Sequence, residues 1–258
     1  MKLRLTAISD THNKHKSLTN DLPGGDILIH SGDFTSIGRE HEVKKFIEWF
    51  NGIDNYTHKI FIAGNHDLTF QSEKLYRLKS QWFDRKMYDD EGVNDKPEWL
   101  KEVLTTELKP NVFYLENSYI TIDDIKIWGS PFSPRFGRDW AFNVDRGHDA
   151  QMLWKGIPKD TDIVITHSPI YGYCDRTYNT SENVGCADLY HRLHEVKPHL
   201  HFCGHVHEAY GYGTIPYKDS WGDIYTFNGS SCSLEYFYQN KPITIDYDFI
   251  KRELNFIL

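Results

Sequence analysis

The chain has 258 residues and a formal net charge of −8, with 39% hydrophobic and 26% charged residues. A net acidic protein lacks the broad positive potential that attracts nucleic-acid polymers or anionic membranes, so we expect neither as a partner. The composition is that of a soluble globular protein with enough apolar residues for a full core. No apolar run approaches the roughly 20 residues of a membrane-spanning helix. Without a linker, low-complexity tract or internal repeat, we expect a single domain spanning residues 1–258.

The cysteine pattern bears on the compartment. Cys174, Cys186, Cys203 and Cys232 form no CxxC pair, and no signal peptide precedes the first predicted strand. Both features favour a reducing environment, so we expect a cytoplasmic protein. Cys203 lies in an apolar run and is expected to be a core residue.

The first part of the chain predicts a β-α-β unit. Apolar, β-branched runs at 3–8, 26–30 and 59–63 are typical of short buried strands. Between the second and third, residues 38–50 have apolar side chains at helical spacing, and Gly52 stands where a helix C-cap is expected. Polar residues follow each strand, at the place where open α/β sheets carry their binding sites.

The rest of the chain alternates between strands, two helices and long loops. Residues 71–96 have no readable pattern apart from an expected surface turn at 89–92. The loops at 129–147 and 169–185 are long enough to suggest a functional role. Strands are expected at 112–115, at 119–128 around an Asp123-Asp124 turn, and at 162–165, 200–203, 224–227 and 243–247; helices are expected at 97–108 and 186–196.

Five motifs at predicted strand ends carry side chains that bind metal ions. Residues two apart on an extended chain point to the same side, so pairs such as Asp10 and His12 can bind one ion together. Imidazole suits Zn, Fe and Mn, while carboxylate and amide oxygens accept harder ions. We therefore expect two divalent metal ions per chain, with Mn²⁺ first and Fe or Zn as alternatives. The motifs are Ser9-Asp10-Thr11-His12, Gly32-Asp33, Gly64-Asn65-His66-Asp67, Thr166-His167 and Gly204-His205-Val206-His207.

This ligand set predicts a hydrolase for a small anionic phosphoester. Asp33 is the natural bridge, because a carboxylate offers two oxygens to ions about 3.5–4 Å apart. Two dications outweigh both carboxylates and a bridging hydroxide, so the site would attract an anion locally. The predicted reaction is attack on phosphorus by a hydroxide that the ions generate from water. His66 points away from its neighbour Asn65 and is expected to protonate the leaving oxygen, with Asp67 orienting its ring.

These five motifs, in this order, resemble the calcineurin-like metallophosphoesterase superfamily. The resemblance implies an α/β fold, a four-layer αββα sandwich of two mixed β-sheets flanked by helices, with a binuclear metal site at one edge. Carried over by position, Asp10, His12 and His207 would bind one ion. Asn65, His167 and His205 would bind the other, and Asp33 would bridge both.

A closer resemblance runs through most of the chain, to the metallophosphoesterase-domain-containing (MPPED) subfamily. It is carried by DILIHSGDFT at 26–35, AGNHDLTF at 63–70, WAFN at 140–143 and HVHEAYG at 205–211. This subfamily implies a metal-dependent phosphodiesterase whose substrates include cyclic nucleotides. Both His205 and His207 are present, which favours a competent enzyme. The match is poorest over residues 71–109.

Other polar residues and other functions stay open. Arg135 and Arg138 are the expected substrate contacts of the 129–147 loop, and Trp140 and Phe142 its expected packing anchors. His30 and His201 lie in apolar strands and are expected to be hydrogen-bonded in the core. The alternative functions are a phosphomonoesterase or protein phosphatase using the same site, and a non-catalytic scaffold that binds a nucleotide or a partner.

Overall fold

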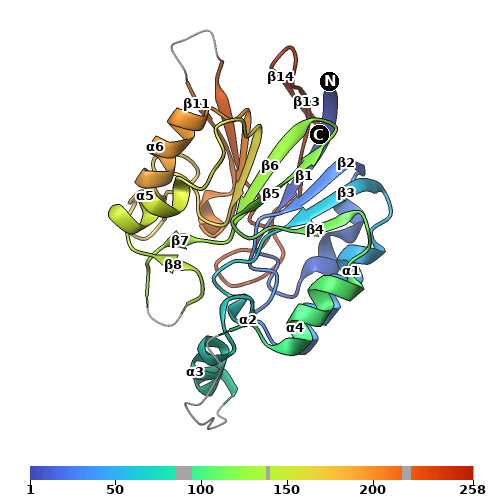
Figure 1. The fold of residues 1–258 in the computed structure, drawn as a ribbon, viewed down its shortest axis with the longest axis vertical. Helices are drawn as coiled ribbons and strands as arrows, with labels where there is room; N and C mark the ends of the chain where they lie inside the picture. The colour runs from blue at the N-terminus through green and yellow to red at the C-terminus, as the bar shows by residue number, and fades with distance from the viewer. Residues whose placement is uncertain (85–94, 138–139, 217–221, 258) are drawn as a thin grey trace.

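Two six-stranded sheets packed face to face form the centre of the protein (Figure 1). The computed structural model describes residues 1–84, 95–137, 140–216 and 222–257. The first sheet has the strand order β14-β13-β1-β2-β3-β4. It contains β1 (Lys2–Ile8), β2 (Gly25–His30), β3 (Tyr56–Phe61), β4 (Val112–Tyr114), β13 (Ile243–Asp248) and β14 (Glu253–Ile257).

The second sheet has the order β11-β12-β10-β9-β6-β5. Its four central strands are parallel, as are β1 to β4 of the first sheet, and its two edge strands are antiparallel. It contains β5 (Ser118–Ile122), β6 (Ile125–Ser130), β9 (Ile163–Thr166), β10 (Leu200–Cys203), β11 (Gly211–Ile215) and β12 (Ile224–Asn228); β7 (Ser133–Pro134) and β8 (Asn143–Val144) form a small separate pair.

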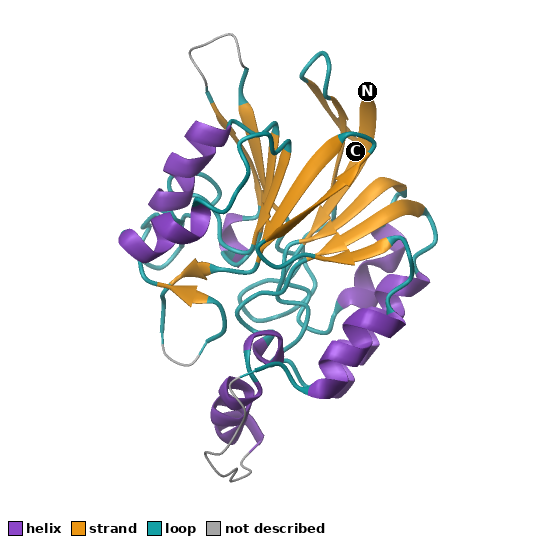
Figure 2. Cartoon of the chain, viewed as in Figure 1, coloured by secondary structure: helices purple, strands orange, loops and turns teal. Residues whose placement is uncertain are grey.

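Helices cover the outer face of each sheet (Figure 2). The first sheet packs against α1 (Glu40–Gly52) and α4 (Glu98–Glu102), and the second against α5 (His148–Trp154) and α6 (Ala187–Val196). The remaining helical segments are α2 (Leu68–Gln71), α3 (Glu73–Asp84), the 3₁₀ helices η1 (His15–Asp21) and η3 (His207–Ala209), and the π-helical turn η2 (Val103–Glu107).

Three apolar clusters fill the spaces between these four layers. Phe46 and Phe50 of α1 meet Phe61 of β3 in the first cluster. The middle cluster joins inward-facing residues of both sheets, such as Ile60 and Phe202. In the third cluster, helices α5 and α6 pack on the second sheet. Alternate residues of a strand face opposite sides, so each sheet buries both of its faces. The predicted αββα sandwich is confirmed.

Several local expectations are corrected. Helix α1 continues through Gly52 and ends against the extended residue Ile53, so Gly52 is not its left-handed cap. The expected helix at 97–108 divides into α4 and η2, because the backbone passes from α to π hydrogen bonding at Val103. The segment after residue 71, for which the sequence predicted no helix or strand, contains the amphipathic helix α3. The expected turn at 89–92 lies outside the described residues.

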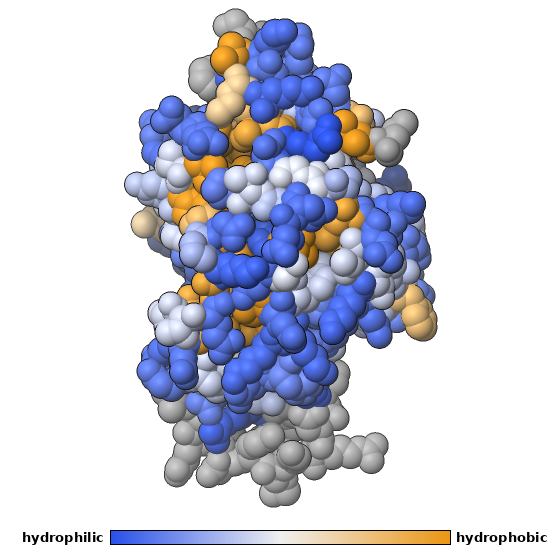
Figure 3. Space-filling view, turned by 90° about the vertical axis from the view of Figure 1, so that its right-hand side faces the viewer, coloured by the Kyte–Doolittle hydropathy of each residue, from blue (hydrophilic) through white to orange (hydrophobic). Residues whose placement is uncertain are grey.

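One face of the protein shows how polar its outer surface is. The face over α1 and α4 is mainly hydrophilic, with scattered apolar residues (Figure 3). Among the helices within the described ranges, none is both long enough and apolar enough to cross a bilayer. All four cysteines are free thiols, and Cys203 is buried as expected.

Candidate metal centre

The predicted ligands come from loops that follow five parallel strands. Asp10 and Asp33 follow β1 and β2, Asn65 follows β3, and His167 and His205 follow β9 and β10. The carboxyl ends of parallel strands lie at one edge of a sheet, and the two sheets here place these edges side by side. Figure 2 shows the resulting gathering of loops below the two sheets.

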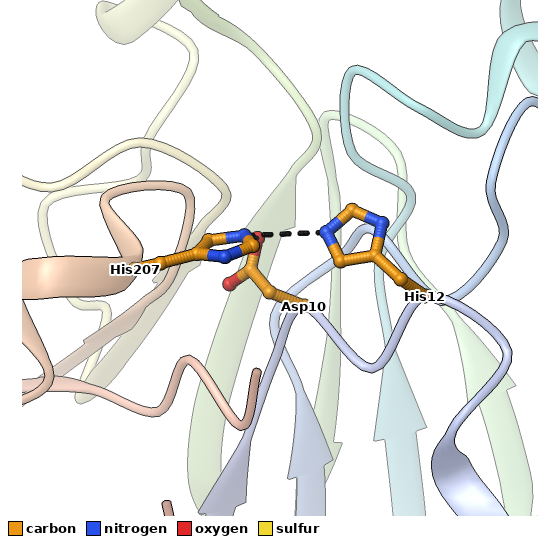
Figure 4. A group of neighbouring side chains, drawn as sticks. All are labelled: Asp10, His12 and His207. Atoms are coloured by element: carbon orange, nitrogen blue, oxygen red, sulfur yellow. Dashed lines mark hydrogen bonds and ion pairs between the residues drawn. The ribbon is translucent and has the colours of Figure 1, made fainter. Parts of the chain in front are cut away.

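Asp10, His12 and His207 form the first cluster of possible ligands. The Nε2 atom of His207 lies 3.5 Å from Oδ1 of Asp10 and 3.2 Å from Nε2 of His12. The two imidazole rings turn toward one another beside the Asp10 carboxylate (Figure 4). Donor atoms from residues almost 200 positions apart in sequence therefore converge on one point.

Asp33, His167 and His205 form the second cluster. The Nε2 atom of His167 lies 3.3 Å from Oδ2 of Asp33 and 2.9 Å from Oδ1 of Asn65. The same Oδ2 atom of Asp33 lies 4.0 Å from Nε2 of His12 in the first cluster. One carboxylate oxygen thus stands between the two clusters, as a bridging ligand would.

Main-chain carbonyls fix the orientation of three of these imidazoles. The Nδ1 atoms of His12, His167 and His207 lie 3.1, 2.9 and 2.8 Å from the carbonyl oxygens of Thr35, Ser31 and Ser233. A carbonyl can only accept, so each Nδ1 carries a proton, and each Nε2 points into the centre, where it can bind a cation once it carries no proton. Metal-binding histidines in proteins are held in this way.

This donor set fits divalent cations. The Oδ1 atom of Asp10 is fully buried and has no hydrogen-bond partner among the described residues. The Nε2 atom of His207 lies 3.5 Å away, too far for a normal hydrogen bond, so a cation would stabilise this buried oxygen further. The Nε2 atoms of His12 and His207, 3.2 Å apart, likewise need either a proton or a cation between them. The residues present can therefore hold the metals that such a centre implies.

Electrostatics divides the four clustered histidines into two pairs. Burial lowers the pKa of His12 and of His205 to about 3. Burial also opposes a charge on His167 and on His207, but the Asp33 and Asp10 carboxylates raise the pKa of each to about 9. Protons and cations would therefore compete at His167 and His207, and binding of metal would release protons there.

The backbone is strained at four of the predicted ligands. Asp10, His12, Asp33 and His205 have φ angles of 51°, 38°, 55° and 72°. Residues other than glycine rarely adopt this left-handed region, and each instance costs about 1–3 kcal/mol unless the surroundings enforce it. Such strain concentrates at functional sites, because it aims side chains that regular structure could not aim.

Two motif glycines leave room for the ligands. A Cβ atom on Gly64 would meet Oδ1 of Asp33, and one on Gly204 would meet Oδ2 of Asp10. Neither carboxylate could keep its position against a methyl group. This close approach is the physical reason for glycine directly before Asn65 and before His205.

His66 lies beside the centre, with its ring held on several sides. Its Nδ1 atom is 2.7 Å from the carbonyl oxygen of Ser36. The ring of Trp140 packs on it at a centroid distance of 4.3 Å and an interplanar angle of 32°. The His12 ring meets it edge to face at 4.6 Å. His66 also has a nitrogen within range of a cluster with His12 and Asp33, so its position allows contact with ion-bound groups.

The structure corrects the role expected of Asp67. Its carboxylate accepts hydrogen bonds from the backbone nitrogens of Asp33, Thr35 and Gly64 at 3.0, 3.0 and 2.8 Å, and from Oγ1 of Thr35 at 2.6 Å. Both oxygens are thereby occupied, and the Ser36 carbonyl orients His66 instead. Asp67 ties the Asp33 loop to the Asn65 loop and so sets the spacing of these ligands.

The arginine-rich loop contacts the centre through its aromatic residues. Phe136 packs on His205 at 4.6 Å, and Trp140 packs on His66. The guanidinium of Arg135 is exposed and pairs with Asp145. Arg138 lies outside the described residues, so contacts of either arginine with a substrate remain predictions. Phe142 is buried against Phe132, as expected of a packing anchor.

Two further residues contact the predicted ligands and were not predicted from the sequence. The Ser230 hydroxyl donates to Oδ2 of Asp10 at 2.8 Å. The ring of Tyr236 lies 4.6 Å from that of His12. Burial, and then the Asp33 and Asp10 carboxylates, raise the pKa of Tyr236, so its phenol stays protonated. The sequence signal for both was weak, since they lie in a loop after β12 that contains no ligand motif.

The histidines expected in the core are hydrogen-bonded there. His30 pairs through Nε2 with Oγ1 of Thr11 at 2.9 Å. His201 pairs through its two ring nitrogens with Oγ1 of Thr166 and Oγ1 of Thr226, both at 2.8 Å. Thr11 and Thr166 directly precede His12 and His167. These buried histidines thus bind the threonines that precede two predicted ligands, and so help to fix the ligand loops.

Comparison with known proteins agrees with this geometry. The model of the calcineurin-like phosphoesterase family matches residues 3–209. Metallophosphoesterase domain-containing protein 1 of Homo sapiens is 39% identical over 247 residues, covering 94% of this chain and 70% of the relative. A UPF0046 protein of Caenorhabditis elegans is 33% identical over 241 residues, covering 93% of this chain and 74% of the relative.

Solved structures share the fold at low sequence identity. TT1561 of Thermus thermophilus aligns with a TM-score of 0.56 and 12% identity, covering 99% of this chain and 98% of the other. The phosphopantetheinyl hydrolase PptH of Mycobacterium tuberculosis aligns with a TM-score of 0.56 and 14% identity, covering 98% and 95%. At these identities the similarity concerns the fold alone.

Proposed function

Because the chain belongs to the calcineurin-like phosphoesterase family, and is thereby a metal-dependent phosphoesterase, we propose that it hydrolyses a small phosphodiester with two bound metal ions. The substrate class we propose is a nucleotide diester such as a cyclic nucleotide. The observation that carries the two-ion proposal is Oδ2 of Asp33, which lies 3.3 Å from Nε2 of His167 and 4.0 Å from Nε2 of His12. Mn²⁺ is the proposed activating ion, and the cytoplasm the proposed location.

The residues divide into a binding set and a proton donor. Asp10, His12 and His207 would hold one ion, Asn65, His167 and His205 the other, and Asp33 both. Bound divalent ions would supply a water of lowered pKa and positive charge against the phosphate. His66, oriented by the Ser36 carbonyl, would give a proton to the leaving oxygen from its Nε2 atom.

The charge around the centre favours a diester over a monoester. Among the described residues, the side chains of the seven predicted ligands and His66 bond to one another, to main-chain groups and to Ser230, and no lysine or arginine is among their partners. A monoester dianion carries one more negative charge than a diester, so a lysine or arginine side chain would stabilise a bound monoester more than a bound diester. As far as the described residues go, the charge near the predicted ligands therefore supports a monoanionic substrate.

The test compares bis-p-nitrophenyl phosphate with p-nitrophenyl phosphate in the presence of Mn²⁺. The proposal expects higher kcat/KM for the diester, followed by hydrolysis of cyclic nucleotides. Preference for the monoester would assign the site to a phosphomonoesterase. If the metal-loaded protein hydrolyses neither compound, the result would support the alternative of a non-catalytic scaffold.

A further inference from the structure

Tyr236 lies over the metal centre and contacts three of its imidazoles. Its ring centroid is 4.6 Å from that of His12 and 5.7 Å from that of His207, with interplanar angles of 83° and 88°. It lies 6.0 Å from the ring of His66. One side chain thus meets two ligands of the first cluster and the proposed proton donor.

A tight turn between β12 and β13 holds Tyr236 in this place. The backbone nitrogen of Ser233 donates to the carbonyl of Phe237 at 2.9 Å, and that of Tyr236 to the carbonyl of Ser233 at 3.0 Å. The same Ser233 carbonyl accepts from Nδ1 of His207 at 2.8 Å. Tyr236 itself has a φ angle of 61°, which is unusual for a bulky residue. The turn that orients a metal ligand therefore also presents Tyr236.

The hydroxyl of Tyr236 is available to a ligand. The residue is 44% exposed, and no partner for its hydroxyl is found among the described residues. Two nearby tyrosines differ in this respect. The Tyr238 hydroxyl donates to Asp21 at 2.7 Å, and the Tyr210 hydroxyl donates to the carbonyl of Lys241 at 2.8 Å. Tyr236 therefore combines a ring packed against the histidines of the centre with a hydroxyl that has no partner among the described residues.

We propose that the Tyr236 hydroxyl donates a hydrogen bond to a phosphoryl oxygen of the substrate, an inference that rests on the proposed phosphoesterase function. Such a donor stabilises charge that builds on the phosphoryl group in the transition state. It adds no formal charge, which suits a monoanionic diester. Its role differs from that of His66, since it acts on an oxygen that stays on phosphorus rather than on the one that leaves.

The leaving group distinguishes the two roles. Methyl p-nitrophenyl phosphate and methyl phenyl phosphate have the same methyl phosphate group but different leaving groups. Phenolate is the poorer leaving group, so its oxygen depends more on receiving a proton. Tyr236→Phe should lower kcat/KM about tenfold or more, by the same factor on both substrates. His66→Ala should be more damaging on the phenyl ester. Tyr119→Phe, at a 53% exposed tyrosine of β5, is the matched control and should leave both rates unchanged.

Binding of inorganic phosphate to the Mn²⁺-loaded protein, measured by calorimetry, provides a second readout that needs no turnover. Tyr236→Phe and Tyr236→Ala should both weaken the binding of phosphate by about tenfold, and neither substitution should change the metal content. Wild-type affinity in Tyr236→Phe with a defect only in Tyr236→Ala would assign a packing role to the ring and overturn the proposal. So would a kinetic loss confined to the phenyl ester. If the wild type hydrolyses neither ester, the proposed function fails, while the phosphate titration still decides the role of Tyr236.

Discussion

The Nε2 atoms of His12 and His207 face each other at 3.2 Å, although both rings have their Nδ1 proton committed to a main-chain carbonyl. Without metal, a proton on Nε2 of His207 lies between them, because, despite burial, Asp10 raises the pKa of His207 to about 9. A bound cation would take the place of that proton. The protein holds both rings there with strained backbone at His12 and a hydrogen bond from His207 to the turn that carries Tyr236. This arrangement is preorganised for a cation, and the predictions below depend on it.

Removing the His66 imidazole should separate chemistry from metal binding. His66→Ala is expected to lower kcat by about a hundredfold or more, because a positioned proton donor typically contributes that much. The loss should be greatest for substrates with poor leaving groups. Metal analysis should find a content close to that of the wild type. Loss of metal in proportion to loss of activity would instead identify His66 as a ligand.

Trp140 should matter through the position of His66. Its ring packs on the imidazole at 4.3 Å, and the ammonium of Lys79 lies 3.9 Å from the Trp140 ring. Trp140→Ala should lower kcat about tenfold or more, since small displacements of a catalytic group are costly. Trp140→Phe keeps an aromatic face and should retain most of the activity. Equal kcat values for both variants and the wild type would exclude a positioning role.

A pair of glycine substitutions tests the close packing at the centre. A Cβ on Gly64 would lie 2.6 Å from the backbone nitrogen of Asp33, whereas a Cβ on Gly52 meets nothing within 4 Å. Gly64→Ala should therefore cost about 1–3 kcal/mol of unfolding free energy and reduce metal binding. Gly52→Ala, in helix α1, should be neutral or stabilising by up to about 1 kcal/mol. Urea unfolding measures both, and similar values for the two variants would contradict the model of a filled ligand pocket.

His201 predicts how stability depends on pH. Burial lowers the pKa of His201 to about 3 in the folded protein, from about 6.5 in the unfolded chain. Between these values the unfolded chain binds the extra proton, so the free energy of unfolding should fall as pH decreases below about 6.5. When a chelator keeps the protein free of metal, His201→Gln should reduce the change of unfolding free energy with pH by about 1.4 kcal/mol per pH unit. Urea unfolding at several pH values measures this dependence. The same change of unfolding free energy with pH in the wild type and in His201→Gln would contradict the lowered pKa of His201.

The fold and the gathering of the candidate metal ligands could be predicted from the sequence because each depends on short-range patterns. Apolar runs identify strands, and the ligands follow directly after them, as Asp33 follows β2. The gathering of loops at one sheet edge then follows from parallel pairing. The resemblance to a family added the assignment of each ligand to an ion, which spacing alone did not give.

Contacts between distant side chains were not readable. Ser36 orients His66 across 30 residues, and Ser230 reaches Asp10 across 220. Asp67 illustrates the limit most clearly, because its place next to His66 suggested a partner that the folded chain does not provide. Its carboxylate instead collects amides from two loops, an arrangement set by tertiary structure. Trp140 and Tyr236 likewise reach the centre from loops whose composition does not specify their direction.

The central claim is that Asp33 joins two ion sites. Metal analysis after incubation with Mn²⁺ and removal of excess metal tests it most directly, in the wild type and in Asp33→Ala. The shared position of Oδ2 predicts about two ions per chain in the wild type and nearly complete loss of both in the variant. Full retention of the pair by Asp33→Ala, or a wild type that binds no ion, would contradict the account.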